Sequence, residues 1–452
     1  MKKLLPKFII VAVFFTVVFT FSGMAYASTI RVGLVRSFEN RTSINISSTS
    51  IEVGRGRVDG TFEYSRTLTS AGGFVVQVDG GQVVVRAGNQ AVFTFLNDAV
   101  GGRQIRATNG ILAMEGASYR GAIEFSLSGG RISAINVICI EEYLYGVLPV
   151  EMSPSFNTEA LRAQAVAART FAMYTIGSNR HPSGNFDICD TTHCQGYHGA
   201  GREYDVTTQA VRDTSGLIIF ALGGNSPLFT PYFSSSGGAT DNSENVWFDA
   251  LPHLRGVVDY YETVARTWTR TYTWAQLTNA VRAEAPSANI GTVTGVSITR
   301  EHLGRVQELT FYGTNGNWST TGQRTMTIFR HISGSLDSRN YYIVGAAGGA
   351  GIAVHVTDGF IANQDAVTNM FVVGANGNVV QVSHAHVFNG QTTRRLTENV
   401  LATGGTGITI NGRGWGHGVG MSQNGANGMA AAGYTFWEIL MHYYTGIEIR
   451  TL

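Results

Sequence analysis

The chain has 452 residues, of which 44% are hydrophobic and 14% are charged. This length and composition allow two or three domains with hydrophobic cores, which excludes disorder as the main state. The 32 Lys and Arg residues nearly balance the 31 Asp and Glu residues. Because such a chain has no basic field to attract a phosphate backbone, we expect no nucleic-acid partner.

The first 27 residues have the pattern of a signal peptide. All three lysines of the chain lie within the first seven residues, and an apolar run follows from Phe8 to Phe21. Ala25-Tyr26-Ala27 matches the small-x-small cleavage pattern. We therefore expect an exported protein that lies in the cell wall or at the outer side of the membrane. If the segment 8–27 is not cleaved, it is long enough to anchor the chain in the membrane.

Strand patterns dominate from residue 28 to about 137. The residues Asp79-Gly80-Gly81 join two of these strands and predict a hairpin. The segments with strand composition are Thr29–Val35, Ser43–Val53, Gly73–Val78, Gln82–Ala87 and Ile132–Ile140. Cys139 lies in the last of them, where we expect it to be an ordinary buried side chain.

An alanine-rich segment from Asn157 to Thr175 has the clearest helical period in the chain. Asn157 is the expected N-cap, and the small side chains predict a helix at the centre of the packing. Because strands and helices occur in separate runs, we expect an α+β fold. It would have mostly antiparallel strands around this helix, C-terminal helices and a substrate groove. The other predicted elements are the helices Asp205–Thr214, Trp274–Ala285, Met421–Ala432 and Thr435–Tyr444, and the strand Leu217–Ala221.

These patterns divide the chain into five parts. We expect a signal peptide at 1–27, a mainly β region at 28–137 and a catalytic core with a candidate zinc knuckle at 138–265. A second mainly β region with insertions follows at 266–410. A glycine-rich loop and C-terminal helices at 411–452 complete the core.

Glu151 is the first candidate for chemistry. It lies among Leu148, Pro149, Val150 and Met152, in what we expect to be a turn before the alanine-rich helix. Apolar neighbours desolvate a carboxylate and raise its pKa, which allows it to act as a general acid near neutral pH. The alternative is a surface glutamate in a turn.

Two cysteines and several histidines form the second candidate. Cys189 and Cys194 have the spacing of a zinc knuckle, and two histidines would complete a closed tetrahedral set with a structural role. His193 and His181 are the expected partners, although His198 is an alternative. A disulfide between the two cysteines is the competing interpretation for an exported chain.

Two glycine-containing loops are further candidates. The segment 231–240 contains Tyr232, three serines and Gly237-Gly238, and its backbone can approach a polar ligand. The segment 412–420 has glycine at every second position and presents Trp415 and His417. Neither loop contains a nucleophile elbow or a dinucleotide fingerprint, and without lysine a Walker A loop is excluded. Structural turns are the alternative for both loops.

Taken together, these stretches resemble the SpoIID/LytB family. The motifs that carry the resemblance occur in the family's order, and they are the segments 141–152, 159–170, 194–197, 235–238, 416–423 and 439–444. The resemblance covers roughly residues 29–452 and is weakest at 54–110 and 340–400.

The resemblance implies a peptidoglycan lytic transglycosylase. Such an enzyme cleaves the bond from N-acetylmuramic acid to N-acetylglucosamine, preferably in peptide-stripped strands, and leaves 1,6-anhydro ends during sporulation or wall remodelling. It implies that Glu151 is the catalytic acid/base, and that Zn²⁺ is bound by His181, Cys189, His193 and Cys194. The implied substrate-binding residues are Tyr232, Ser236, Gly237, Gln195, His417 and Gln423.

Two other functions remain open at the level of the sequence. The family includes amidase enhancers, so the chain could be a non-catalytic glycan-binding protein that assists a cell-wall amidase. A zinc-dependent hydrolase is the other, and it would require an open coordination position on the metal.

Overall fold

The computed structural model describes residues 29–57, 60–96, 102–176, 178, 180–247, 249–263, 265–345, 371–373, 379–381, 386–388, 393–395 and 402–451. The predicted signal peptide at 1–27 lies outside the described residues. The predicted α+β class is confirmed, since mostly antiparallel sheets surround a group of helices. Of the helices in the described part of the chain, none has the length and hydropathy needed to span a membrane.

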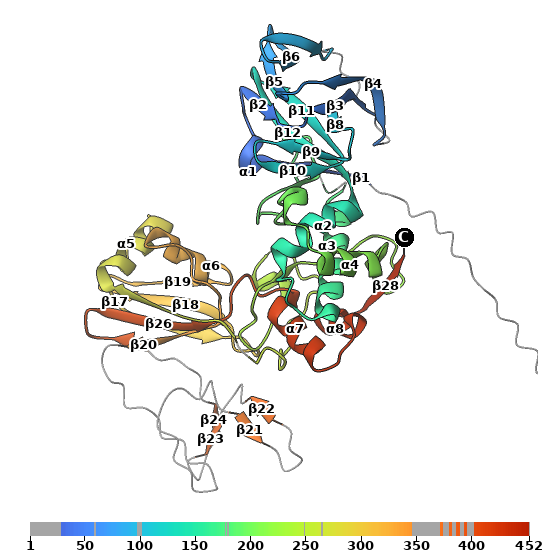
Figure 1. Cartoon of the computed structure of the whole chain (residues 1–452). Coiled ribbons are helices and arrows are strands. Elements are labelled where there is room, and N and C mark those ends of the chain that lie inside the picture. The colour runs from blue at the N-terminus through green and yellow to red at the C-terminus, as the bar shows by residue number, and fades with distance from the viewer. Residues whose placement is uncertain are drawn as a thin grey trace, which may run out of the picture.

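The N-terminal residues form two sheets, drawn in blue and teal in Figure 1. The seven-stranded sheet has the order β13 (Ile188–Cys189), β1 (Thr29–Gly33), β12 (Arg131–Cys139), β11 (Ala122–Ser128), β8 (Gly102–Ala107), β3 (Ser50–Gly56) and β4 (Phe62–Thr69). The six-stranded sheet has the order β10 (Ala117–Arg120), β9 (Ile111–Met114), β2 (Ser43–Ile46), β5 (Phe74–Asp79), β6 (Gln82–Ala87) and β7 (Gln90–Thr94). A short helix, α1 (Val35–Phe38), follows β1.

The predicted hairpin is confirmed. Asp79 pairs with Gln82 across the turn, and Gly80 and Gly81 have φ angles of 57° and 77°. Two successive positive φ angles define the turn that best matches the twist of paired strands. The predicted strand 43–53, in contrast, is two strands, β2 and β3, which belong to different sheets.

Helices form the centre of the molecule. Helix α3 (Thr158–Thr175) packs against α2 (Ile140–Glu151), α4 (Asp205–Asp213), α7 (Gln423–Ala431) and α8 (Phe436–Tyr443). The side chain of Asn157 caps α3 by accepting the N–H of Glu159, as predicted. The alanines of α3 are buried, which lets its neighbours approach closely and confirms its central position. Two short sheets complete this part, β14 (Leu217–Ala221) with β28 (Ile447–Thr451), and β15 (Tyr232–Phe233) with β27 (Met421–Ser422).

Several predictions of local structure are wrong in the described residues. The strand predicted at Thr29–Val35 ends at Gly33, since α1 begins at Val35. Helix α2 extends through Pro149 to Glu151, so Glu151 ends a helix instead of lying in a turn. The helix tolerates this proline because Leu144 and Leu148 are fully buried and hold its last turns in place. Cys139 is only half-buried, since the strand ends there and α2 begins at Ile140.

The start of the helix predicted at Met421 is also wrong. Met421 and Ser422 pair with β15 as strand β27, and α7 begins only at Gln423. The hydroxyl of Ser422 caps the helix by accepting the N–H of Gly425 at 3.1 Å. A serine at this point therefore both ends the strand and starts the helix.

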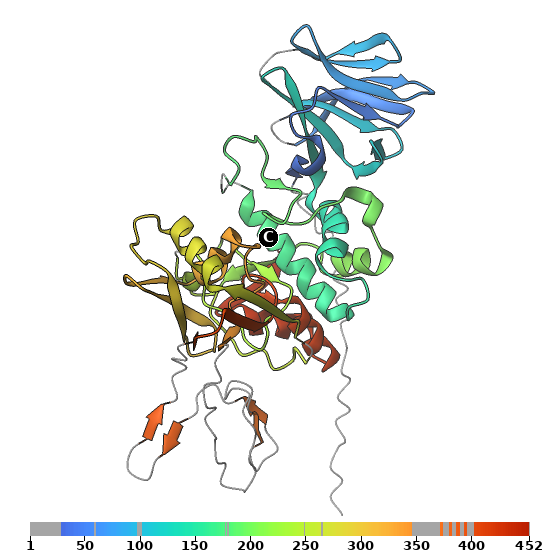
Figure 2. The same cartoon turned by 90° about the vertical axis from the view of Figure 1, so that its left-hand side faces the viewer.

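Residues 267–345 and 402–413 form a second group of strands around a hydrophobic core of their own, drawn in colours from yellow to red (Figures 1 and 2). One sheet has the order β16 (Thr267–Thr273), β26 (Gly407–Arg413), β20 (Tyr341–Gly345). The other has the order β19 (Asn317–Thr321), β18 (Val306–Gly313), β17 (Val293–Arg300), β25 (Ala402–Thr403). The helices are α5 (Trp274–Glu284), α6 (Arg324–Thr327) and the 3₁₀ helix η3 (Ile328–His331). Two further 3₁₀ helices belong to the helical centre, η1 (Gly199–Arg202) and η2 (Ser243–Asn245). Four short strands form two separate pairs, β21 (Phe371–Val373) with β22 (Val379–Gln381), and β23 (His386–Phe388) with β24 (Thr393–Arg395).

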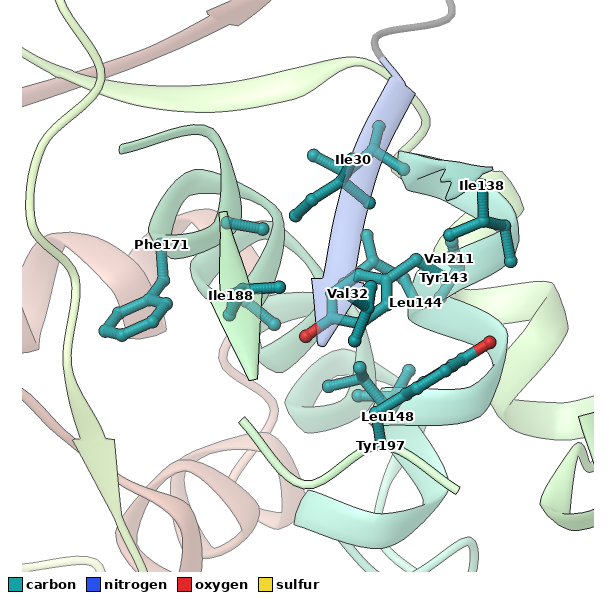
Figure 3. Close-up of a cluster of buried hydrophobic side chains, with 14 of the residues drawn as sticks. Ile30, Val32, Ile138, Tyr143, Leu144, Leu148, Phe171, Ile188, Tyr197 and Val211 are labelled. Atoms are coloured by element: carbon teal, nitrogen blue, oxygen red, sulfur yellow. The ribbon is translucent and has the colours of Figure 1, made fainter. Parts of the chain in front are cut away.

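The seven-stranded sheet and the central helices share one hydrophobic core. Figure 3 shows Ile30 and Val32 of β1 next to Ile188 of β13 and Leu144 of α2. Strand β13 runs parallel to β1, with Gly33 opposite Cys189. Cys189, one of the candidate metal ligands, therefore lies in an edge strand of the seven-stranded sheet.

Arg169 joins four elements of the helical centre. It is 1% exposed, and its guanidinium donates two hydrogen bonds of 2.7 Å to the carboxylate of Glu141 on α2. It also donates to the carbonyl oxygens of Val211 at 3.1 Å and Leu217 at 3.4 Å. One buried cation on α3 thus holds α2, the end of α4 and β14.

Replacing Arg169 by Met should lower the free energy of unfolding by about 3–5 kcal/mol, because the change leaves a partly buried carboxylate without its partner. Arg162→Met on the same helix is the matched control. Arg162 pairs with Glu159 and Asp213 at the surface, so its loss should cost less than about 1 kcal/mol. Urea denaturation measures both values, and equal losses would contradict this role of Arg169.

Candidate functional site

Glu151 lies at the C-terminal end of α2, where its side chain is half-buried. The backbone N–H of Gly196 donates to its Oε1 atom at 2.5 Å. Burial raises the pKa of Glu151 above the ordinary range of a glutamate, and the Gly196 hydrogen bond opposes this only in part. Among the described residues, no second carboxylate contributes to the shift. The arrangement gives a single carboxyl group that retains its proton to higher pH than usual.

Gln195 connects two tyrosines beside Glu151. It is 1% exposed, its Oε1 accepts the Tyr143 hydroxyl at 3.1 Å, and its Nε2 donates to the Tyr232 hydroxyl oxygen at 3.1 Å. Nε2 also donates to the carbonyl oxygen of Ala168 at 3.1 Å. These partners fix the orientation of the amide. Because the Tyr232 oxygen accepts from Gln195, its own hydrogen is left to donate elsewhere.

Both tyrosines stay protonated near neutral pH. Burial raises the pKa of Tyr143 and of Tyr232 well above the usual range, and the nearby Glu151 carboxylate raises each further. The structure therefore brings together three of the predicted site residues, Glu151, Gln195 and Tyr232. Tyr143 was not among the predicted residues, although its position in the segment 141–152 is a signal that could have identified it.

His417 supports the strand that carries Tyr232. Its Nε2 lies 3.1 Å from the Tyr232 carbonyl oxygen, and the Val419 N–H donates to its Nδ1 at 3.1 Å. Its ring also packs against Phe233 and Trp247, with centroid distances of 5.4 and 5.2 Å. Burial lowers the pKa of His417 to about 4, so the imidazole is neutral and each nitrogen has one backbone partner. This geometry gives His417 a positioning role, and its binding of substrate stays a prediction.

Ser236 and Gly237 belong to a different network. The Ser236 hydroxyl and the Gly237 N–H donate to the same oxygen, Oε2 of Glu262, at 2.6 and 2.7 Å. Ser236 is fully buried, and its oxygen also accepts the N–H of Gly238 at 3.1 Å. Their hydrogen-bonding groups are thus already used within the protein. Glu262 was not predicted, because no sequence motif marks a carboxylate whose partners lie 25 residues earlier.

Gln423 is the remaining predicted residue of the site. It begins α7, is 8% exposed and donates from Nε2 to Oε1 of Gln164 on α3 at 3.5 Å. It therefore joins two helices. For Ser236, Gly237 and Gln423 alike, a contact with substrate stays a prediction.

The predicted metal ligands lie together. One ligand atom from each of His181, Cys189, His193 and Cys194 is within 4.8 Å of the others. Nε2 of His181 is 3.1 Å from the Cys194 sulfur, and Nδ1 of His193 is 3.7 and 3.5 Å from the sulfurs of Cys189 and Cys194.

The three short distances, 3.1 to 3.7 Å, are close to those of a tetrahedral zinc site. Ligand bonds of about 2.0–2.3 Å place neighbouring ligand atoms of a tetrahedron about 3.3–3.8 Å apart. A hydrogen bond from the Cys194 thiol also lowers the pKa of Cys189 to about 4, which provides a thiolate. The four residues can therefore hold a metal ion in a closed site.

The structure has neither the disulfide considered for the two cysteines nor His198 as the fourth ligand. Cys189 and Cys194 are free and form no disulfide. His198 lies elsewhere, since its Nε2 contacts the guanidinium of Arg36. Of the two histidines considered, only His181 is in the cluster.

Comparison with known proteins identifies the family. Residues 128–220 match the family model SpoIID, described as Stage II sporulation protein. An uncharacterized protein of Brachyspira hyodysenteriae is 30% identical over 74% of this chain and 73% of its own length. The chain is also similar to two proteins of Bacillus subtilis strain 168. Stage II sporulation protein D is 28% identical over 70% of this chain and 76% of its own length.

The second Bacillus subtilis protein is named Amidase enhancer and is 27% identical over 76% of this chain. The match spans only 46% of that relative's length. The chain belongs to the SpoIID/LytB family, as its motifs predicted.

His417 should make stability depend on pH in a definite direction. Its pKa is about 4 in the folded chain and about 6.5 when unfolded, so the unfolded state takes up a proton first as the pH falls. The contribution of neutral His417 to the free energy of unfolding is complete above pH 6.5 and is lost as the pH falls toward 4. It is on the order of 3 kcal/mol. Urea denaturation across this range should show a smaller loss for His417→Gln than for the native chain, and equal losses would contradict the assignment.

Proposed function

We propose that the chain is a peptidoglycan lytic transglycosylase in which Glu151 is the catalytic acid/base. The observation that carries the proposal is the single half-buried carboxyl group of Glu151, whose pKa is raised and whose Oε1 is held by Gly196. Relatives named Stage II sporulation protein D and Amidase enhancer support a role at the cell wall.

A single carboxyl group suits transglycosylation better than hydrolysis. Ordinary glycosidases use a second carboxylate to activate water or to attack the sugar. In the proposed reaction Glu151 first donates its proton to the glycosidic oxygen leaving C1 of N-acetylmuramic acid. The resulting carboxylate then accepts the proton of that sugar's C6 hydroxyl as its oxygen bonds to C1. The product is a 1,6-anhydro end, and Glu151 is protonated again.

The hydrogen bonds around Glu151 support this assignment of roles. Because Oε1 accepts the Gly196 N–H, Oε2 is the oxygen that carries the transferable proton. The Tyr232 hydroxyl retains its proton and has it available for a sugar oxygen near the reacting bond. Gln195 holds that hydroxyl in place from the side of α3. General acid/base assistance of this kind contributes typically about 10²–10⁴ in rate.

We further propose that His181, Cys189, His193 and Cys194 bind Zn²⁺. With four protein ligands the ion would supply a structural cross-link and no open coordination position. The ligand Cys194 is directly followed by Gln195 and Gly196, which contact Tyr232 and Glu151. Fixing the ligands therefore also fixes the two residues that organise the carboxyl group. The closed set argues against a zinc-dependent hydrolase.

The expected partner is a peptidoglycan glycan strand, preferably stripped of its peptides, and a cell-wall amidase would supply such strands. The proposed location is outside the cytoplasm, in line with the signal pattern at 1–27. The proposed activity would serve in sporulation or in cell-wall remodelling.

A non-catalytic enhancer of an amidase is the second candidate function. The relative named Amidase enhancer is the observation that favours it. In that role the chain would bind strands and leave them intact. The buried position and raised pKa of Glu151 favour the enzyme, because a binding surface has no use for a desolvated carboxyl group.

Glu151→Gln should reduce strand cleavage by at least about 10³-fold while glycan binding changes little, because the amide keeps the size of the side chain but has no proton to transfer. Native activity should fall as the pH rises through the raised pKa of Glu151, since the acid must be protonated. Chromatography of strand lengths measures cleavage, and calorimetry measures binding.

Glu142→Gln is the matched control for this experiment. Glu142 lies on the same helix with its side chain 40% exposed, so its replacement should leave the rate unchanged. Cleavage by Glu151→Gln at the native rate would remove Glu151 from the mechanism. A native chain that binds strands without shortening them would favour the enhancer.

Cys189→Ser should lower the melting temperature by on the order of 5 °C and reduce the zinc content below one ion per chain. The rate per folded molecule should change less than the stability, because the ion is structural. His198→Ala is the control, since His198 lies outside the ligand set. Metal analysis and calorimetry test both variants. A chelator that stopped cleavage without changing the melting temperature would contradict a structural ion.

A further inference from the structure

An exposed aromatic side chain lies in the glycine-rich loop and carries an arginine on its face. Trp415 is 38% exposed, and the Arg266 guanidinium carbon lies 3.7 Å from its ring centroid. Stacking of this kind orients a guanidinium with its edge free to pair with another group. Neither residue has a part in the site described above.

The backbone around this pair is firmly held. Trp415 exchanges two hydrogen bonds with Ser235, at 2.8 and 3.1 Å. The N–H groups of the flanking glycines, Gly414 and Gly416, donate to the carbonyl oxygens of Arg266 and Asp337 at 2.7 and 2.9 Å. Both glycines have positive φ angles, 85° and 110°, which a side chain there would strain. A large apolar side chain is thus presented to solvent by a rigid loop.

The charge of Arg266 has no partner inside the described protein. Among the described residues, no carboxylate lies within 4.0 Å of its guanidinium. Its neighbours differ, because Arg270 pairs with Asp337 and Arg339 pairs with Asp241. Arg266 is therefore positioned by the indole ring and left available to an anion from outside.

The stack lies close to the candidate active site along the chain. Ser235 follows Tyr232 by three residues, so their Cα atoms are at most about 11 Å apart. His417, two residues after Trp415, contacts the Tyr232 carbonyl oxygen. A glycan of a few sugar units that reaches the Tyr232 hydroxyl can extend over this distance to the stack.

We propose that Trp415 and Arg266 form a subsite for a sugar ring that carries a carboxylate. Trp415 packs against the apolar C–H face of the ring, and Arg266 pairs with the carboxylate. In a peptidoglycan strand that group is the lactyl carboxylate of N-acetylmuramic acid. It is free only where no peptide is attached, because the peptide occupies it as an amide.

This subsite rests on the proposed function and deepens it. The positive charge of Arg266 gains a partner only from a peptide-free strand, so it discriminates by attraction between charges. A strand whose lactyl groups are amides loses the ion pair and keeps the stacking contact. The two residues therefore have separable effects. Trp415 contributes to the affinity for both kinds of strand, and Arg266 contributes to the discrimination between them.

Calorimetric titration separates these effects. The two ligands are peptide-free glycan strands and the same strands after conversion of their lactyl carboxylates to amides. The protein is the full chain carrying Glu151→Gln, so that strands stay intact. In this background the free-carboxylate strand should bind at least about 5-fold more tightly than the amidated strand, an advantage that falls as salt is added.

The variants assign the effect to the two residues. Arg266→Gln should bind both strands with the affinity that the parent has for the amidated strand. Trp415→Leu, which keeps apolar bulk but has no planar face, should bind both strands about 10-fold more weakly. Trp437→Ala is the control, because Trp437 is similarly exposed, at 36%, but lies on α8. Melting temperatures within 2 °C of the parent, about the effect of 1 kcal/mol, will verify folding.

Three results would overturn the subsite. They are equal affinity of the parent for the two strands, retained discrimination in Arg266→Gln, and unchanged affinity in Trp415→Leu. Each of these leaves the proposed function intact if the native chain still cleaves strands. A native chain that neither binds nor cleaves either strand would contradict the proposed function itself.

Discussion

The candidate active site depends on one hydrogen bond, from the backbone N–H of Gly196 to Oε1 of Glu151. It joins the end of α2 to the loop that follows the metal ligands. Without this donor, burial alone would set the protonation of the carboxyl group, and neither of its oxygens would be distinguished from the other. With the donor, one oxygen is fixed as an acceptor and the other is left for the substrate. The loop must therefore be held as firmly as the helix.

Two other contacts hold that loop from the N-terminal side. Strand β13, which ends at Cys189, lies parallel to β1 at the edge of the seven-stranded sheet. The backbone N–H of Arg31 donates to Asp187 at 2.9 Å, and its guanidinium pairs with the buried Glu124 at 2.7 Å. The seven-stranded sheet, whose strands β1 and β13 share a hydrophobic core with α2 and α3, is thus part of the support of Glu151.

The features predicted best from the sequence are those that depend on neighbouring residues alone. Helix α3 follows from its period and from Asn157 at its start, and the hairpin follows from its two glycines. The turn expected around Glu151 was wrong, because its residues were judged without tertiary packing, and buried Leu148 keeps the last turn of α2 in place. Cys189 and Cys194 are marked by spacing, but only the fold could decide between His181, the expected ligand, and the alternative His198.

Long-range polar contacts could not be predicted from the sequence. Tyr143 and Tyr232 meet at Gln195 across 52 and 37 residues, and no periodic pattern encodes such a meeting. The partner of Ser236, Glu262, and the stack of Arg266 on Trp415 are of the same kind. These contacts arise where separate elements converge. Sequence motifs were therefore enough to locate the candidate site, but its hydrogen bonds could be known only from the structure.

The masses of the products from peptide-free strands provide the most direct test of the central claim. The native chain should release fragments lighter by one water than the products of hydrolysis, because the sugar's own C6 hydroxyl closes on C1. Fragments at the hydrolytic mass would contradict this claim, since they require a second group that activates water beside Glu151.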